Sequence, residues 1–332
     1  MTNRMSDFQN TLPTSPSATD DPLDFGAMTE RYRRELLVHC YRILGSFEDA
    51  EDALQEALLS AWRQFDSLRS MAALRAWLYK IATNVSLNML ARQRVRQLPP
   101  ASYQPANPRD PLPDEYIAGD IASPEACYET RESVSLAFLA ALQILPGRQR
   151  AILIMRDVLG WNPAEIGDLL DQSVPAVNSA LQRARATTRK NYARTDHPSR
   201  PADERSDKLL ERFVQAWETA DSAGLVALLR EDAILTMPPL PAWYRGRAAI
   251  REFLELHLFA ANRAEPRPRF RVMAARANGC PALASYQIDA AGIYRPGAIL
   301  VFTMQGDQIT QLDDFLALDH RLFQRFKLPL SL

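Results

Sequence analysis

Residues 161–190 read WNPAEIGDLLDQSVPAVNSALQRARATTRK, and their spacing predicts two short helices joined by a tight turn. Ile166 and Leu169 belong to the apolar side of the first helix. Ser173 is placed to cap the second helix, and Pro175 falls in its first turn, where proline is tolerated. Two helices in this arrangement are typical of a helix-turn-helix.

The second helix of this stretch has an apolar and a polar side. Val177 and Leu181 mark the apolar side, and residues 172–195 contain no acidic residue. Arginines on such a helix suit phosphate or guanine, and Asn or Gln suits base edges, so the pattern favours DNA binding. The alternative is an ordinary helical hairpin with a basic surface. The side expected to face DNA carries Ser173, Pro175, Ala176, Asn178, Ser179, Gln182, Arg183 and Arg185.

Charge is segregated along the chain. The 332 residues carry a net charge of −1, and a hydrophobic fraction of 47% provides cores for two or three domains. Acidic residues cluster at 48–56, whereas residues 67–109 contain basic residues and no acidic one. This separation indicates two partners, one basic and one polyanionic. For any single charge, a solvated helix face is the simpler interpretation.

Several classes of protein are disfavoured by the sequence. Cys40, Cys127 and Cys280 lie far apart without the spacing of a metal site, so we expect no metal and no cofactor. The sparse cysteines fit the reducing cytoplasm. An N-terminal apolar segment typical of signal peptides is missing, and no apolar run is long enough for a membrane span. We therefore expect a cytoplasmic protein without a membrane partner.

The expected fold class is multidomain: two all-α domains, the second with the helix-turn-helix, followed by an α+β domain. Helical spacing dominates the first two domains. In the last domain, helices precede strand-like runs separated by turn residues. The expected divisions are a disordered segment 1–26, a helical domain 27–98, a linker 99–130, a helical domain 131–195, a linker 196–206 and an α+β domain 207–332. Within the first linker, Leu112, Tyr116 and Ile117 are candidates for docking on a domain.

Three segments occur in a fixed order across the helical part. They read GSFEDAEDALQEALLSAWRQF, RAWLYKIATNVSLNMLARQR, and LPGRQRAILIMRDVLGW followed by the stretch quoted first. Together they resemble bacterial RNA polymerase sigma factors of the extracytoplasmic-function group, over residues 27–195. The domains at 27–98 and 131–195 then correspond to sigma regions 2 and 4. The ordered set is far more specific than any one motif.

The resemblance implies partners for each segment. Core RNA polymerase would bind region 2 through the clamp helices of its largest subunit and region 4 through its flap. Region 2 would also open and recognise the −10 promoter element, with an extruded base held near residues 65–73, while the helix-turn-helix would recognise the −35 element. An anti-sigma factor or a small ligand is a further partner whose identity the sequence leaves open. By match, Asp49, Asp52, Gln55 and Glu56 take the clamp contact, and Arg75, Lys80, Arg92, Arg94 and Arg96 suit phosphates on the −10 side. Trp77 shares a face with Leu74 and Ile81, which favours core packing over base stacking.

The C-terminal domain resembles SnoaL-like members of the NTF2-like fold. The segments ERFVQAWETADSAGLVALLREDAILTMPP and WYRGRAAIREFL carry this resemblance. It implies a cone formed by a curved sheet and helices, and a domain that modulates sigma activity. A catalytic base in such a cone needs desolvation and a partner donor, and turn or packing roles are simpler for most of its polar residues, so we expect no enzyme. The polar candidates in the cone are Asp232, Tyr244, His257, Tyr286, Asp289 and Asp314. Candidates for lining a cone pocket are Met237, Trp243, Tyr244, His257 and Tyr286.

Two other functions compete with a promoter-specificity subunit. One is a stand-alone DNA-binding regulator with a ligand-sensing cone, and the other is an enzyme whose cone performs the chemistry. The acidic residues 48–56 and the second basic segment argue against the stand-alone regulator. DNA footprinting without polymerase would support it, and turnover by the cone would support the enzyme.

Overall fold

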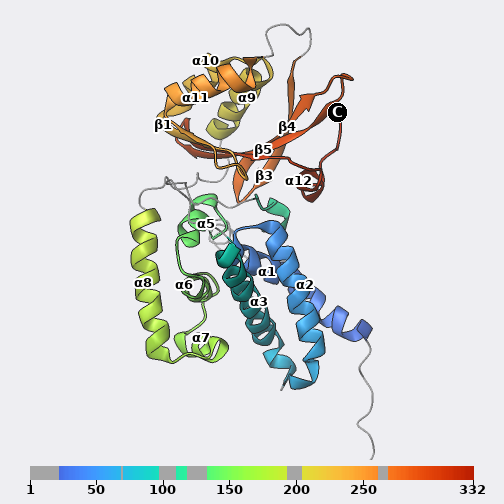
Figure 1. Ribbon diagram of the computed structural model, residues 1–332, viewed down its shortest axis with the longest axis vertical. Coiled ribbons are helices and arrows are strands. Elements are labelled where there is room, and N and C mark those ends of the chain that lie inside the picture. Colours follow the sequence, from blue (N-terminus) through green and yellow to red (C-terminus); the bar gives the residue numbers. More distant parts are fainter. Residues whose placement is uncertain (1–21, 69, 97–109, 118–132, 193–203, 261–267) are drawn as a thin grey trace, which may run out of the picture.

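The computed structural model describes residues 22–68, 70–96, 110–117, 133–192, 204–260 and 268–332. These residues form a helical half and a sheet half, with the sheet domain at one end of the helices (Figure 1). Among the described helices, none combines the length and apolarity needed to cross a membrane. Within the same described ranges, no group of His, Cys, Asp and Glu side chains is arranged to hold a metal ion.

Three long helices form the N-terminal bundle. Gly45, with a φ of 72°, ends the first helix. Ser46 then caps the second helix by accepting a hydrogen bond from the Asp49 amide at 3.3 Å. Two short 3₁₀ turns lead into the third helix. The elements are α1 (Pro22–Leu44), α2 (Phe47–Arg63), η1 (Phe65–Ser67), η2 (Met71–Ala73) and α3 (Leu74–Arg96).

The first helix begins earlier than the composition of its segment predicts. Residues 1–26 were expected to be disordered, and this is wrong for residues 22–26, which belong to α1. Phe25 is buried and its ring lies 5.3 Å from the ring of Phe65, edge to face. This long-range contact stabilises the first turn, and Pro22 suits a helix start because its missing N–H would be unpaired there. The preceding residues lie outside the described ranges.

The second helical bundle contains the helix-turn-helix. A capping box starts its first helix, with Asn162 and Glu165 each bonding the other's backbone amide. Asp171, with a φ of 53°, ends that helix and directs the chain into the next. The elements are α5 (Leu136–Gln143), α6 (Gly147–Leu153), one π-helical turn η4 (Ile154–Val158), α7 (Pro163–Leu170) and α8 (Val174–Tyr192).

The two helical bundles share one hydrophobic core. Helix α7 lies against α3, where the ring of Tyr79 is 5.4 Å from the ring of Trp161. The Lys80 ammonium also pairs with the Asp171 carboxylate at 3.2 Å. Buried residues from both bundles form a single cluster, so the regions packed here form one body in this conformation.

Arg150 joins the two bundles from inside this core. Its guanidinium donates to the carbonyl oxygen of Ile43 on α1, to the Gln143 side chain at 2.7 Å and to the Leu145 carbonyl at 3.3 Å. Arg150 is 3% exposed. Carbonyl oxygens lose their hydrogen bonds to water when they are buried, and this buried guanidinium donates replacement hydrogen bonds to them.

The C-terminal domain is an α+β fold built on a six-stranded sheet with strand order β2-β1-β6-β5-β4-β3. The antiparallel meander of its last four strands is as the sequence predicts. The parallel pairing of β1 with β6 and the short edge strand β2 were not predicted. The elements are α9 (Glu204–Glu218), α10 (Ser222–Leu228), β1 (Leu229–Thr236), β2 (Trp243–Arg245), α11 (Arg247–Phe253), a π-helical turn η5 (Leu254–Leu258), β3 (Phe270–Ala277), β4 (Cys280–Ile288), β5 (Tyr294–Gln305), β6 (Gln308–Leu316) and α12 (Arg321–Arg325).

The sheet is covered on both faces. Helices α9, α10 and α11 close the concave face around Phe213, Trp217 and Phe302, which gives the expected cone. The other face packs against α12, with Leu322 and Phe323 buried, and against Leu136 of α5. The C-terminal tail therefore packs on its own domain, and the second sheet face adjoins the helical half.

We expect Arg150→Ala to lower the free energy of unfolding by about 3 kcal/mol, because it leaves buried carbonyl oxygens without donors. Arg148→Ala, on the same helix but at an exposed position, should change it by less than about 0.5 kcal/mol. Urea unfolding followed by circular dichroism measures both variants. Equal stabilities of the two would contradict the structural role of Arg150.

Candidate functional site

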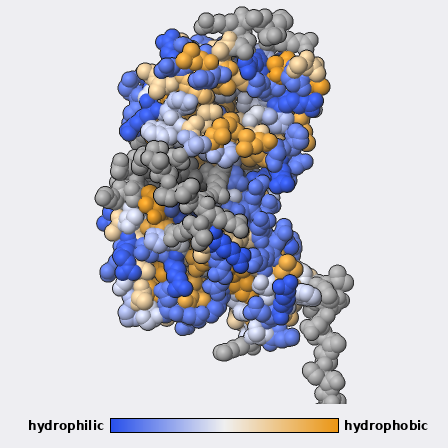
Figure 2. All heavy atoms as spheres, in the orientation of Figure 1, coloured by the Kyte–Doolittle hydropathy of each residue, from blue (hydrophilic) through white to orange (hydrophobic). Residues whose placement is uncertain are grey.

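Helix α2 presents an acidic outer face. Its inner side buries four alanines, Phe47 and Leu54 against α1 and α3. Of the residues predicted to contact polymerase, Asp52, Gln55 and Glu56 are exposed and Asp49 is half-buried. Positions three and four residues apart lie side by side on a helix, so these side chains form one surface. Figure 2 shows hydrophilic residues along the flank of the helical half where α2 lies.

The basic residues of α3 have different surroundings. The Arg75 guanidinium pairs with Glu35 of α1 at 2.9 Å, and that hydrogen bond raises its pKa. Lys80 pairs with Asp171, as described above, and Arg92 is exposed. The side chains of Arg94 and Arg96 lie outside the described residues. Trp77 packs against the shared core, which confirms the packing role.

Helix α8 has the two-sided character predicted for it. Val177, Ala180 and Leu181 are buried. Ser173 Oγ accepts a hydrogen bond from the Ala176 amide at 3.4 Å, at the start of the helix. Each of the eight residues predicted to face DNA is exposed: Ser173, Pro175, Ala176, Asn178, Ser179, Gln182, Arg183 and Arg185. Arg185 Nε also donates to Asp157 at 3.1 Å, so this arginine has an internal partner.

The cone encloses a small cavity at which one carboxyl faces apolar side chains. Asp314 of β6 lines it together with Phe213, Trp217 and Phe253. Asp314 Oδ1 is buried and has no hydrogen-bond partner among the described residues. Burial raises the pKa of this carboxyl to about 7, because the charged form would be desolvated.

The pocket residues chosen from the sequence mostly lie elsewhere. Tyr286 faces the opposite side of the sheet, where its hydroxyl donates to the Pro329 carbonyl at 2.9 Å. His257 is exposed, and Trp243 is 37% exposed. Placing these three in a cone pocket is therefore wrong: strand alternation buries Tyr286 on the other face of the sheet, and His257 and Trp243 are exposed. Met237 and Tyr244 do pack against the cone core.

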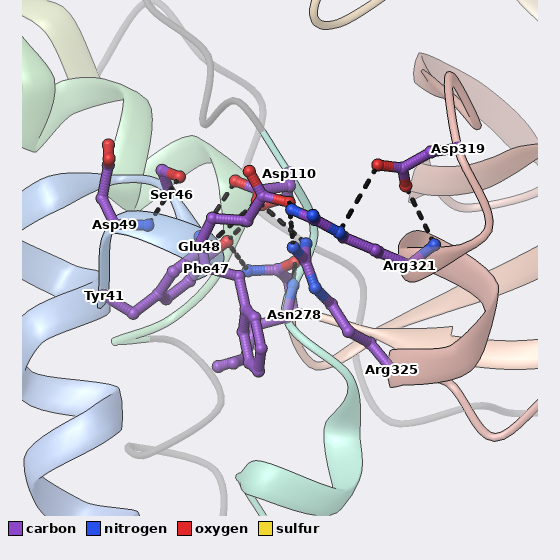
Figure 3. Close-up of polar contacts among 11 residues, drawn as sticks. Tyr41, Ser46, Phe47, Glu48, Asp49, Asp110, Asn278, Asp319, Arg321 and Arg325 are labelled. Atoms are coloured by element: carbon purple, nitrogen blue, oxygen red, sulfur yellow. Dashed lines mark hydrogen bonds and ion pairs between the residues drawn. The ribbon is translucent and has the colours of Figure 1, made fainter. Parts of the chain in front are cut away.

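Arg325 of the C-terminal domain contacts the start of α2 (Figure 3). The Arg325 guanidinium of α12 lies 2.7 Å from the Glu48 carboxylate and 3.0 Å from the Asp110 carboxylate. It also stacks on the ring of Phe47, 4.9 Å from the centroid. Asp110 in turn accepts the Phe47 amide at 2.9 Å, so one carboxylate caps α2 and receives the arginine.

The described part of the first linker is held between the two halves. Leu112 and Ile117 are buried, as expected for residues that dock on a domain. Asn278, in the β3–β4 turn, pairs with Leu112 through two hydrogen bonds of 2.8 Å. Arg276 of β3 pairs with the Asp114 carboxylate at 3.1 Å. Residues 110–117 of the linker are thus packed between the two halves, in agreement with the docking expected for Leu112 and Ile117.

Three family matches follow the order of the domains. Sigma-70 region 2 matches residues 28–96, Sigma-70 region 4 matches residues 135–187, and the SnoaL-like domain matches residues 210–312. The ECF RNA polymerase sigma factor SigG of Mycobacterium tuberculosis is 42% identical over 325 residues, covering 93% of this chain and 85% of that protein. The chain belongs to the ECF RNA polymerase sigma factors. It is therefore a sigma factor that binds core RNA polymerase and promoter DNA in transcription initiation.

Other relatives cover less of the sequence or match in fold. The sigma factor SigM of Mycobacterium tuberculosis is 34% identical over 166 residues, which covers 50% of this chain and 76% of that protein. The crystal structure of the Mycobacterium tuberculosis sigma factor SigJ superposes with a TM-score of 0.59 at 22% identity, covering 93% of this chain and 100% of that one. At this identity the likeness shows a shared fold. The stand-alone regulator is not favoured by these relatives.

Sequence patterns did not identify the contacts between the sigma domains and the SnoaL-like domain. The dipeptide Asn278-Gly279 is one of the turns expected between the strand-like runs, and local sequence gives no signal for the partners of Asn278 or Arg325. A positive φ of 55° at Asn278 agrees with that turn, but its side-chain partners lie far away in sequence. Short-range periodicity carries no information about such partners.

For this sigma factor we expect the free energy of unfolding to fall as the pH rises from about 4 to about 7, because the folded state keeps the proton of Asp314 over this range. The unfolded carboxyl has a pKa near 3.9 and the folded one about 7, so the stabilisation is complete below about pH 4 and is lost toward pH 7. Asp314→Asn should remove about 2–3 kcal/mol of the difference in unfolding free energy between about pH 5 and pH 8. Urea titrations at both pH values measure it. The exposed Asp307→Asn is the control, and an unchanged pH dependence in Asp314→Asn would refute the assignment.

Proposed function

We propose that three exposed helix faces make separate contacts in promoter-directed initiation, one with polymerase and two with DNA. The face of α2 with Asp52 and Glu56 binds the clamp helices of the largest polymerase subunit. The basic side of α3 contacts the −10 element, and the exposed face of α8 enters the major groove at the −35 element. The observation that carries this assignment is that α8 exposes every residue chosen for DNA contact while burying its apolar side.

The charges on these faces fit their partners. Acidic residues on α2 attract a basic coiled coil, which raises the association rate and sets the register of docking. Arg183 on α8 is exposed on the same surface as Asn178 and Gln182, which offers one guanidinium and two amides to base edges or phosphates. Because each set lies on a separate helix, one sigma factor can hold polymerase and DNA together.

Promoter binding requires the two helical bundles to separate. Helix α7 covers part of α3 through the Tyr79–Trp161 contact and the ion pair of Lys80 with Asp171. In that arrangement the Lys80 ammonium is paired with the Asp171 carboxylate of region 4. The two helices proposed to contact DNA, α3 and α8, are then packed through one shared core. The −10 and −35 elements are separate sites, so we infer that the packed form is the resting form and that polymerase binding opens it.

We further propose that the SnoaL-like domain restrains this opening. Its Arg325 forms an ion pair with Glu48, which lies one turn before Asp52, a residue of the proposed clamp contact. Its Asn278 accepts a hydrogen bond from the Leu112 amide of the linker. Docking of the clamp helices on α2 and docking of α12 on Glu48 then compete for the same end of the helix. By linkage, whatever weakens the domain contact strengthens polymerase binding. The domain acts through contacts and performs no chemistry.

We expect Arg183→Ala to reduce promoter-directed transcription by about tenfold or more, since a guanidinium contact to a base or phosphate contributes roughly 1–3 kcal/mol. In vitro transcription with core polymerase measures this. Arg251→Ala, an exposed arginine in the SnoaL-like domain, is the charge-matched control and should leave the output unchanged. Affinity for core polymerase should be the same in both variants. Wild-type output from Arg183→Ala would remove α8 from the proposed interface.

We expect Arg325→Ala to raise the affinity for core polymerase by about three- to tenfold, because it removes a partly buried ion pair that closes the domain onto α2. Arg295→Ala is the matched control, since Arg295 pairs with Asp289 inside its own domain. Titration of labelled protein with core polymerase gives both affinities. A weaker affinity for Arg325→Ala would mean that the domain assists polymerase binding.

A further inference from the structure

The first turn of α8 exposes three apolar residues in a row. Val174 is 41% exposed, and Pro175 and Ala176 beside it are also exposed. Val177, three residues after Val174, is fully buried, so the buried side of the helix does not extend over its first turn. A single exposed valine is ordinary on a protein surface, but these three residues occupy the turn that a helix-turn-helix brings closest to the bases.

The same face of the helix becomes polar further along. Val174 lies one turn before Asn178, and Ala176 lies three residues before Ser179. Both polar residues are exposed, as is Arg183. The start of α8 lies at the end of the helical half away from the SnoaL-like domain (Figure 1), so that domain does not cover this turn.

The backbone of this first turn offers little hydrogen bonding to a base. Pro175 has no backbone N–H, and the Ala176 amide donates to Ser173 Oγ at 3.4 Å. The Val177 amide donates to the Ser173 carbonyl oxygen at 3.0 Å. Purine acceptor atoms placed against the aliphatic side chains would lose water without gaining a donor, which costs free energy. The turn is therefore suited to an apolar group of the DNA.

We propose that Val174, with Pro175 and Ala176, contacts the 5-methyl groups of thymines in the −35 element and thereby sets part of the sequence preference of the helix-turn-helix. The 5-methyl of thymine is the apolar group that base pairs present in the major groove, and aliphatic side chains make contact with it. The proposal rests on the proposed docking of α8 in the major groove.

The spacing along α8 fits this placement. From Val174 to Arg183 the helix rises by roughly 13 Å, whereas the major groove is about 12 Å wide and about 8.5 Å deep. With the first turn on the floor of the groove, Arg183 therefore lies at the level of the phosphates, and Asn178 lies between, beside the base edges. The apolar turn then contributes sequence preference, and the arginine contributes affinity that depends on salt.

The test uses the full-length protein with core polymerase and a promoter selected by transcription from random duplex DNA. Each thymine of its −35 element is replaced in turn by deoxyuridine, which lacks the methyl group and keeps the base pairing. At one position or more, this replacement should weaken holoenzyme binding about three- to fivefold, the effect of exposing one buried methyl group. In a promoter with cytosine at that position, 5-methylcytosine should bind more tightly than cytosine by a similar factor.

Two substitutions at Val174 assign the methyl contact to this residue. Val174→Ser should make thymine and deoxyuridine equivalent, because the apolar contact is lost, whereas Val174→Ile should keep the difference. Ile293→Ser, at an exposed branched residue of the SnoaL-like domain, is the matched control and should bind like the wild type. Circular dichroism verifies the fold of each variant. A selected −35 element without thymine would overturn the proposal.

A parallel variant, Arg183→Ala, separates this inference from the function on which it rests. If Arg183→Ala weakens promoter binding while the wild type binds deoxyuridine like thymine at every position, the methyl contact fails and the docking of α8 stands. If Arg183→Ala and Val174→Ser both bind the promoter like the wild type, the assignment of α8 to the −35 element is itself wrong. If Val174→Ser weakens binding to thymine and deoxyuridine equally, the valine only supports the helix, and the proposal is overturned.

Discussion

The arrangement of the domains depends on the side chain of Asn278. This residue is fully buried in the turn between β3 and β4, at a positive φ of 55° that asparagine tolerates better than most residues. Its amide nitrogen donates to the Tyr41 hydroxyl at 3.0 Å and to the Val134 carbonyl at 2.8 Å, while its oxygen accepts from the Leu112 amide at 2.8 Å. One amide therefore joins the SnoaL-like domain to α1, to the linker and to the start of region 4. Because a buried unpaired amide is costly, these contacts form or break together.

The packing around Asn278 also positions α12 on α2, the helix proposed to bind polymerase. With the β3–β4 turn fixed on Tyr41, α12 lies over the start of α2, and Arg325 meets Glu48 and Asp110 there. The same helix then exposes its acidic residues and, further along, Leu59 and Trp62. The contact of Arg325 and the proposed polymerase contact thus share one helix, which is a simple physical basis for the proposed competition between them.

Sequence patterns predicted the elements of this molecule that depend on residues close together in the sequence. Helical spacing identified both sides of α8, and the turn residues identified the meander from β3 to β6. The parallel pairing of β1 with β6, the partners of Asn278 and the outward position of Tyr286 depend on contacts between distant segments. Composition likewise misjudged Pro22 and Phe25, because the ring of Phe65, which is distant in sequence, packs on that turn. The charge pattern predicted Lys80 as a phosphate contact but did not show that its ammonium pairs with the Asp171 carboxylate.

Hydrogen–deuterium exchange at the amides of Leu112 and Asn278 tests most directly whether polymerase and the SnoaL-like domain compete. Both amides are hydrogen-bonded across the interface, to Asn278 Oδ1 and to the Leu112 carbonyl. They should exchange slowly in the free protein and markedly faster once core polymerase is bound, while promoter DNA alone should leave them protected. Equal protection of both amides with and without core polymerase would contradict the competition.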